Sequence, residues 1–186
     1  MITNIVETVQ KNLGYPVLQK VDPNSQEVKH SEERSSWEKL AQSAITAVLA
    51  GLVKFGRSDI GANYLVSGGT KPNWLELIFA GKHSEAVDKV AHYSNTTVPE
   101  ATEHMQKIAN EAVKLIHESI GDKETPEKVK TYMKGQRHNV LLYLPAAMQL
   151  GDLLNDDTLD DRTNKMEGPI SNFMHNIENK LSGGGS

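Results

Sequence analysis

The chain has 186 residues, of which 38% are apolar and 24% are charged, and it contains no cysteine. This composition is typical of one folded globular domain, and it excludes disulfide bonds, thiolate nucleophiles and thiolate metal sites. The formal net charge of -4 comes from well-mixed signs, so we expect no nucleic acid partner. Because the amino-terminal residues lack the pattern of a secretory signal, we expect a cytoplasmic protein.

Two short helices are predicted at the start of the chain. The first runs from Ile2 to Leu13, with Gly14 in the position that ends a helix. The second runs from Pro16 to Val21, since proline is favoured in a first helical turn.

A long helix is predicted from near Ser35 to about Gly56. Ser35 and Glu38 have the spacing of a capping box, in which each side chain satisfies a backbone amide at the helix start. Apolar residues cover almost the whole circumference, which predicts that other helices surround this one. Its most apolar stretch, residues 44–53, is too short to cross a bilayer, which takes about 20 residues, so we expect no membrane span.

Four further helices are predicted in the middle of the chain. They cover residues 58–66, 74–80, 84–92 and about 97–120. Thr97 and Glu100 form a second capping box at the start of the last one. Its apolar residues make an arc on one side only, which predicts a helix with one face in water.

Similar segments recur about 69 residues apart. The segment from Lys39 to Ile45 resembles the segment from Lys107 to Val113, and Asn4 to Glu7 resembles Asn73 to Glu76. Such a period indicates a structural unit that needs its copy to complete a core. We therefore predict a single all-α domain built from a duplicated helical unit, about residues 4–57 and 73–121, joined by residues 58–72.

The remaining residues, 125–181, are predicted to form a carboxy-terminal helical extension. A helix begins at Thr125 and Pro126, and Gly135 is expected to interrupt it. The apolar segment 139–155 is expected to break at Pro145 and start a new helix there. An amphipathic helix is predicted over 170–181, and residues 182–186 form a flexible Gly/Ser tail outside the fold.

No catalytic constellation emerges from the sequence, so we expect a non-enzymatic protein without a cofactor. Residues 51–58 resemble a phosphate-binding loop, but Arg57 replaces the lysine and the segment belongs to a helix. Ser58 lies between two glycines, but it is better explained as a helix cap than as a nucleophile. The seven histidines are scattered and lack the spacing of metal ligands.

Acidic residues gather between positions 152 and 161. Asp156, Asp157 and Asp160 are weak candidates for cation ligands, because carboxylates bind hard cations such as calcium. The spacing differs from that of a calcium-binding loop, and acidic residues beside a helix start are also favoured by the helix dipole. We therefore predict no metal site.

The order of several segments resembles the YidB-like bacterial family. These segments are the small apolar residues from Ala44 to Leu52, the stretches from Gly61 to Leu65 and from Leu77 to Lys82, and the long helix that ends near Ile116. The resemblance covers about residues 4–120. It implies an all-α bacterial protein that carries a domain of unknown function, and it implies no reaction and no functional residues.

The leading functional hypothesis is a module for macromolecular interaction or self-association. Arg57, Tyr64 and Trp74 lie near the joint and are candidate surface anchors, because arginine, tyrosine and tryptophan dominate binding hot spots. A simpler interpretation is that Trp37 and Trp74 fill the core.

The alternative hypothesis is a binder of a small apolar or lipid-like ligand in a pocket between helices. The pocket would be lined by Leu141, Leu144, Met148, Leu153 and Phe173. Such an apolar set is more often an ordinary core than a pocket, so the pocket stays the alternative.

Overall fold

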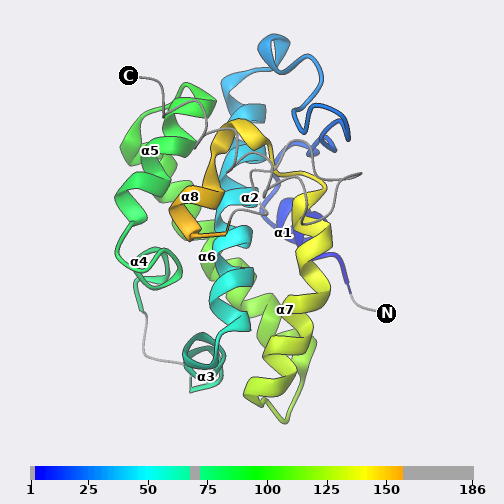
Figure 1. The fold of residues 1–186 in the computed structure, drawn as a ribbon, viewed down its shortest axis with the longest axis vertical. Helices are drawn as coiled ribbons and strands as arrows, with labels where there is room; N and C mark the ends of the chain where they lie inside the picture. Colours follow the sequence, from blue (N-terminus) through cyan, green and yellow to red (C-terminus); the bar gives the residue numbers. More distant parts are fainter. Residues whose placement is uncertain (1–2, 68–71, 157–186) are drawn as a thin grey trace, which may run out of the picture.

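A computed structural model describes residues 3–67 and 72–156, and these residues form one all-α domain without strands (Figure 1). Its helices are α1 (Ile5–Asn12), α2 (Ser36–Arg57), α3 (Asp59–Ser67), α4 (Trp74–Ile78), α5 (His83–Ser94), α6 (Val98–Ile120), α7 (Pro126–Leu141) and α8 (Leu150–Leu154). Short 3-10 turns occur at Ser31–Glu33 and Ala146–Met148. The fold class is as predicted, while the helix expected over 170–181 and the tail at 182–186 lie outside the described residues.

Helix α2 is the centre of the domain, as the sequence predicts. It runs along the long axis of the molecule and packs against α1, α3, α4, α5, α6, α7 and α8 (Figure 1). The capping box is present: the Glu38 amide donates to Ser35 Oγ at 3.2 Å, and the Ser35 amide donates to Glu38 Oε2 at 2.9 Å. Buried Thr46 donates to the Gln42 carbonyl oxygen at 2.6 Å, so it adds no unsatisfied group to the core.

Two glycines permit close approach to α2. A Cβ on Gly61 would lie 1.8 Å from the carbonyl oxygen of Phe55, so only glycine fits at the tight corner between α2 and α3. A Cβ on Gly51 would lie 2.4 Å from Ile78 Cγ2, which places α4 directly against the backbone of α2. These contacts fix where the two short helices sit.

Helix α6 covers the core with one face and exposes the other. Its buried residues include Met105, Ile108 and Ile116, and the Thr97 hydroxyl accepts from the Glu100 amide at 3.3 Å. The helix ends at Gly121, whose φ of 70° is readily adopted only by glycine. The predicted amphipathic helix is confirmed.

The helix predicted from Pro16 to Val21 is wrong, because residues 15–22 are not helical. The side chain of Gln42 accepts from the Gln19 amide at 2.9 Å and donates to the Gln19 carbonyl oxygen at 3.0 Å. The Val21 amide donates to the Leu142 carbonyl oxygen at 2.9 Å. These partners come from distant parts of the chain, and they replace the local hydrogen bonds that a helix would make.

The predicted interruption at Gly135 is also wrong. Helix α7 continues through this residue to Leu141, because an isolated exposed glycine costs a helix only about 1 kcal/mol while one face of α7 packs on α2. The expected break near Pro145 is confirmed in part: α7 already ends at Leu141, a 3-10 turn follows Pro145, and the next helix, α8, begins only at Leu150.

The structure does not show the predicted duplication. Helices α2 and α6 are both long and both begin at a hydroxyl cap. Between α1 and α2, however, only the short turn Ser31–Glu33 is helical, whereas the 12-residue helix α5 lies between α4 and α6. No helix of the described part of the chain is long and apolar enough to span a membrane.

Candidate functional site

Three cationic side chains from two helices surround a hollow beside α2, which we call the cationic hollow. Lys54 and Arg57 extend from α2 and Arg137 extends from α7. The remaining lining residues are apolar, except for Asp156: they are Ala50, Val53, Val140 and Leu141. Positively charged groups therefore surround an apolar floor.

The helical periodicity of the two segments explains this arrangement. On α2, Ala50, Val53, Lys54 and Arg57 are three or four residues apart and thus share one face. On α7, Arg137 is three residues before Val140 and four before Leu141, so these side chains also share one face. Because α2 and α7 pack against each other, the small and branched side chains meet while the long cationic ones reach over them.

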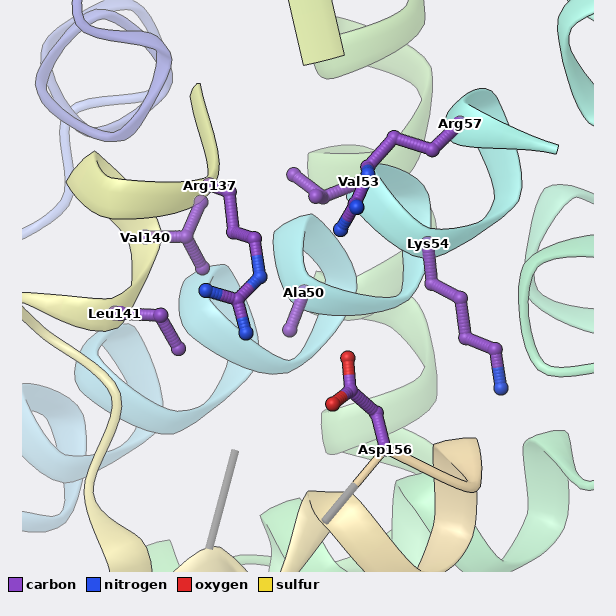
Figure 2. A pocket seen from close by; sticks show the side chains of 8 residues that line it. All are labelled: Ala50, Val53, Lys54, Arg57, Arg137, Val140, Leu141 and Asp156. Carbon is purple, nitrogen blue, oxygen red and sulfur yellow. The ribbon is translucent and has the colours of Figure 1, made fainter. Parts of the chain in front are cut away.

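Figure 2 shows how the charged groups are directed. The guanidinium groups of Arg57 and Arg137 extend from their two helices over the same apolar surface, and the carboxylate of Asp156 points into the space between Arg137 and Lys54 (Figure 2). Among the described lining residues, three carry a positive charge and one carries a negative charge. The described part of the hollow therefore has a net positive charge.

Lys54 and Arg57 form no ion pair with any residue of the described ranges 3–67 and 72–156. Both lie in the last turn of α2, where cations are favoured by the helix dipole, and this effect alone accounts for two basic residues near the end of the helix. It does not account for Arg137, which is contributed by another helix. The convergence of charges from two helices is the informative feature.

The hollow is narrow. It holds about 10 Å³ of space for the centre of a water molecule, which corresponds to roughly one water. Pockets for drug-sized ligands usually measure about 300–1,000 Å³. The cationic hollow thus fits one small anionic group, such as a carboxylate, and no larger molecule as a whole.

The three predicted surface anchors are only partly brought together. Tyr64 and Trp74 form an edge-to-face pair, with ring centroids 5.9 Å apart and an interplanar angle of 87°, and Phe55 lies 6.3 Å from Tyr64. Trp74 is buried and Tyr64 is partly buried. Arg57 is exposed and lines the cationic hollow, which neither aromatic residue lines.

The core interpretation of the tryptophans is correct for Trp74 and wrong for Trp37. Trp37 is 43% exposed and packs against Tyr15 and His104, with ring centroids 5.1 and 5.3 Å away. Tyr15 Oη lies 2.6 Å from His104 Nδ1. Burial raises the pKa of Tyr15 to about 12, and the negative charge of Glu103 adds to the shift. This cluster joins α2 and α6 to the segment after α1.

The weak cation candidates gain no support from the described residues. Asp156 lies beside the cationic side chains of the hollow, and Asp157 and Asp160 lie outside the described residues. Within residues 3–67 and 72–156, no three acidic or histidine side chains are placed to hold a metal ion.

The residues predicted to line an apolar pocket are distributed over different places. Leu141 lines the cationic hollow, and Met148 lines an open groove of about 600 Å³ against α5. Leu144 and Leu153 belong to the buried core, and Phe173 lies outside the described residues.

A second open groove, of about 340 Å³, lies along α1; we call it the α1 groove. It is lined by Val6, Glu7, Gln10, Lys11, Val17, Leu18 and Tyr143.

Sequence reasoning identified Arg57 but missed Lys54 and Arg137 as its neighbours. Arg57 and Arg137 are 80 positions apart, and no local pattern connects them. The only signal was the position of Arg137 three residues before Val140 on an amphipathic helix. This spacing places Arg137 beside Arg57 only because α7 packs on α2.

Comparisons with known proteins give no match: no family model, no curated protein and no solved structure matches this chain. The function must therefore be inferred from the residues of the site.

Proposed function

We propose that this is a non-catalytic binding protein whose cationic hollow receives an acidic side chain of a protein partner. The observation that carries the proposal is the convergence of Arg57 from α2 and Arg137 from α7 over an apolar floor. Arginine forms paired, charge-assisted hydrogen bonds with carboxylates. A bound carboxylate would also be attracted by the positive charges of Lys54 and Arg57.

The size of the hollow favours a macromolecular partner over a free small molecule. A site with room for roughly one water accepts the end of a side chain, while the rest of the ligand must lie outside on the surface. Arginine is enriched at protein interfaces, where a few buried anchors supply most of the binding energy. Leu141, the partly exposed member of the apolar floor, adds a preference for an apolar residue that lies beside the acid at the edge of the hollow.

The proposal is tested with the peptide acetyl-Glu-Leu-Glu-Glu-amide, titrated into the full chain at low salt. We expect weak binding that shifts the methyl NMR signals of Val53, Val140 and Leu141 and that weakens as salt screens the charges. The charge reversal Arg57→Glu should weaken binding at least tenfold. The matched control is Lys123→Glu, which makes the same charge change at an exposed residue in the loop between α6 and α7.

Two outcomes contradict the proposal. One is equal weakening by Arg57→Glu and Lys123→Glu, which would mean that net charge alone attracts the peptide. The other is binding of inorganic phosphate as tightly as the peptide, since the site would then recognise any anion. A peptide with serine in place of leucine keeps the charge, and weaker binding of this peptide would support a role for the apolar floor.

A small apolar ligand is the second candidate, and the α1 groove favours it. Its volume of about 340 Å³ lies within the range of ligand pockets, and Val17 at its edge is 69% exposed. Titration with decanoate should shift the methyl signals of Val6 and Val17 if the groove binds such ligands. Unchanged signals at millimolar decanoate would remove this candidate.

Self-association, the duplicated origin and the YidB-like relationship also stay proposals. Hydroxyl caps at the starts of α2 and α6 support the duplication, although only α2 has the full capping box, and the missing counterpart of α5 counts against it. Aligned sequences of relatives would test both ideas, because a true duplication strengthens the period when many sequences are averaged. Sedimentation at several concentrations would test self-association.

A further inference from the structure

We infer that the acidic stretch that follows Asp156 in the same chain, residues 157–161, competes with the partner for the cationic hollow. This inference rests on the proposed function, and it concerns the regulation of the same site. It would give a role to the acidic residues at positions 157, 160 and 161.

The described part of the chain ends at the cationic hollow. Asp156 is the last described residue, and it lines the cationic hollow with its carboxylate directed toward Arg137 and Lys54 (Figure 2). Asp160 is four residues further on, so an extended chain carries it at most about 14 Å from Asp156. The three acids at 157, 160 and 161 can therefore all reach the site.

The acidic stretch and the hollow are complementary in charge and polarity. Residues 157–161 read Asp-Thr-Leu-Asp-Asp, so acidic residues flank a single leucine, Leu159. The hollow has the matching pattern, with Lys54, Arg57 and Arg137 around an apolar floor. The stretch thus has the same chemistry as the acidic ligand that we propose for the partner.

Tethering makes even a weak contact effective. A ligand attached through a short linker has an effective concentration in the millimolar range, so an intrinsic dissociation constant of about 1 mM already leaves the site occupied for a large part of the time. A partner must displace this occupant. Its apparent affinity is reduced by the fraction of molecules in which the hollow is occupied.

The test compares the full chain with the full-length triple variant Asp157→Asn, Asp160→Asn and Asp161→Asn. We expect the variant to bind the Glu-Leu-Glu-Glu peptide about three- to tenfold more tightly, because its own acids no longer compete. The Nε–H NMR signals of Arg57 and Arg137 should also differ between the two proteins without added peptide. The substitution Leu159→Ser should give a smaller change in the same direction.

The control is the triple variant Glu32→Gln, Glu76→Gln and Glu85→Gln. It changes the net charge equally at exposed residues that do not line the hollow. Equal gains in the two triple variants, or no gain in either, would overturn the inference while the proposed function stands. Absence of peptide binding to every variant would overturn both.

Discussion

The side chain of Gln42 on α2 binds both backbone polar groups of Gln19. The Gln19 amide donates to Gln42 Oε1 at 2.9 Å, and Gln42 Nε2 donates to the Gln19 carbonyl oxygen at 3.0 Å. Gln42 Nε2 also donates to the Tyr143 carbonyl oxygen at 2.5 Å, and Gln42 Oε1 accepts from Arg34 at 3.3 Å. All four hydrogen-bonding positions of the buried amide are used.

Gln42→Met should therefore be destabilising, by about 2–3 kcal/mol. Methionine has a similar volume but no amide group, and it leaves the buried carbonyl oxygen of Tyr143 without this donor. Urea unfolding measures the loss, and hydrogen exchange should show reduced protection of the Gln19 amide. Gln106→Met on α6 is the control, because Gln106 is only partly buried. A loss no larger than that of the control would contradict the role of Gln42.

The same residue shows what sequence could and could not reveal. Local patterns predicted α2 and α6 well, because the caps at Ser35 and Thr97 and the apolar periodicity lie within the helices themselves. The non-helical segment 15–22 depends on Gln42 and Leu142, which lie far away in sequence. The candidate site has the same character, because Arg57 was identified but its neighbour Arg137 depends on the packing of α7 against α2.

Gly61→Ala and Gly135→Ala should change stability in opposite directions. At Gly61 a Cβ would lie 1.8 Å from the Phe55 carbonyl oxygen, so the corner between α2 and α3 must shift, at a cost of about 3 kcal/mol or more. Gly135 is exposed inside α7, where alanine is favoured over glycine by about 1 kcal/mol. Thermal unfolding of both variants checks this pair. A destabilised Gly135→Ala would contradict the continuous α7.

Stability should fall at alkaline pH as two tyrosines ionise. Burial raises the pKa of Tyr15 and of Tyr93 to about 12 in the folded protein, with Glu103 and Glu27 respectively adding to the shifts, whereas the ordinary value is 10.0. Because the folded state holds these protons more tightly, their contribution is complete below pH 10 and is lost as the pH rises toward 12.

Urea unfolding at several pH values measures this dependence, and tyrosinate absorbance reports the ionisation itself. The double variant Tyr15→Phe and Tyr93→Phe should be less sensitive to pH over the same window. An equal fall in stability in the double variant would assign the effect to other groups.

The two tryptophans should differ in their access to solvent. Trp37 is 43% exposed at the start of α2, whereas Trp74 is 7% exposed and packs edge-to-face on Tyr64. Acrylamide should therefore quench the emission of Trp74→Phe, which retains Trp37, more strongly than that of Trp37→Phe. The rings of Tyr15 and His104 cover part of Trp37, so its quenching should stay below that of free tryptophan. Equal quenching of the two variants would contradict the difference in exposure between Trp37 and Trp74.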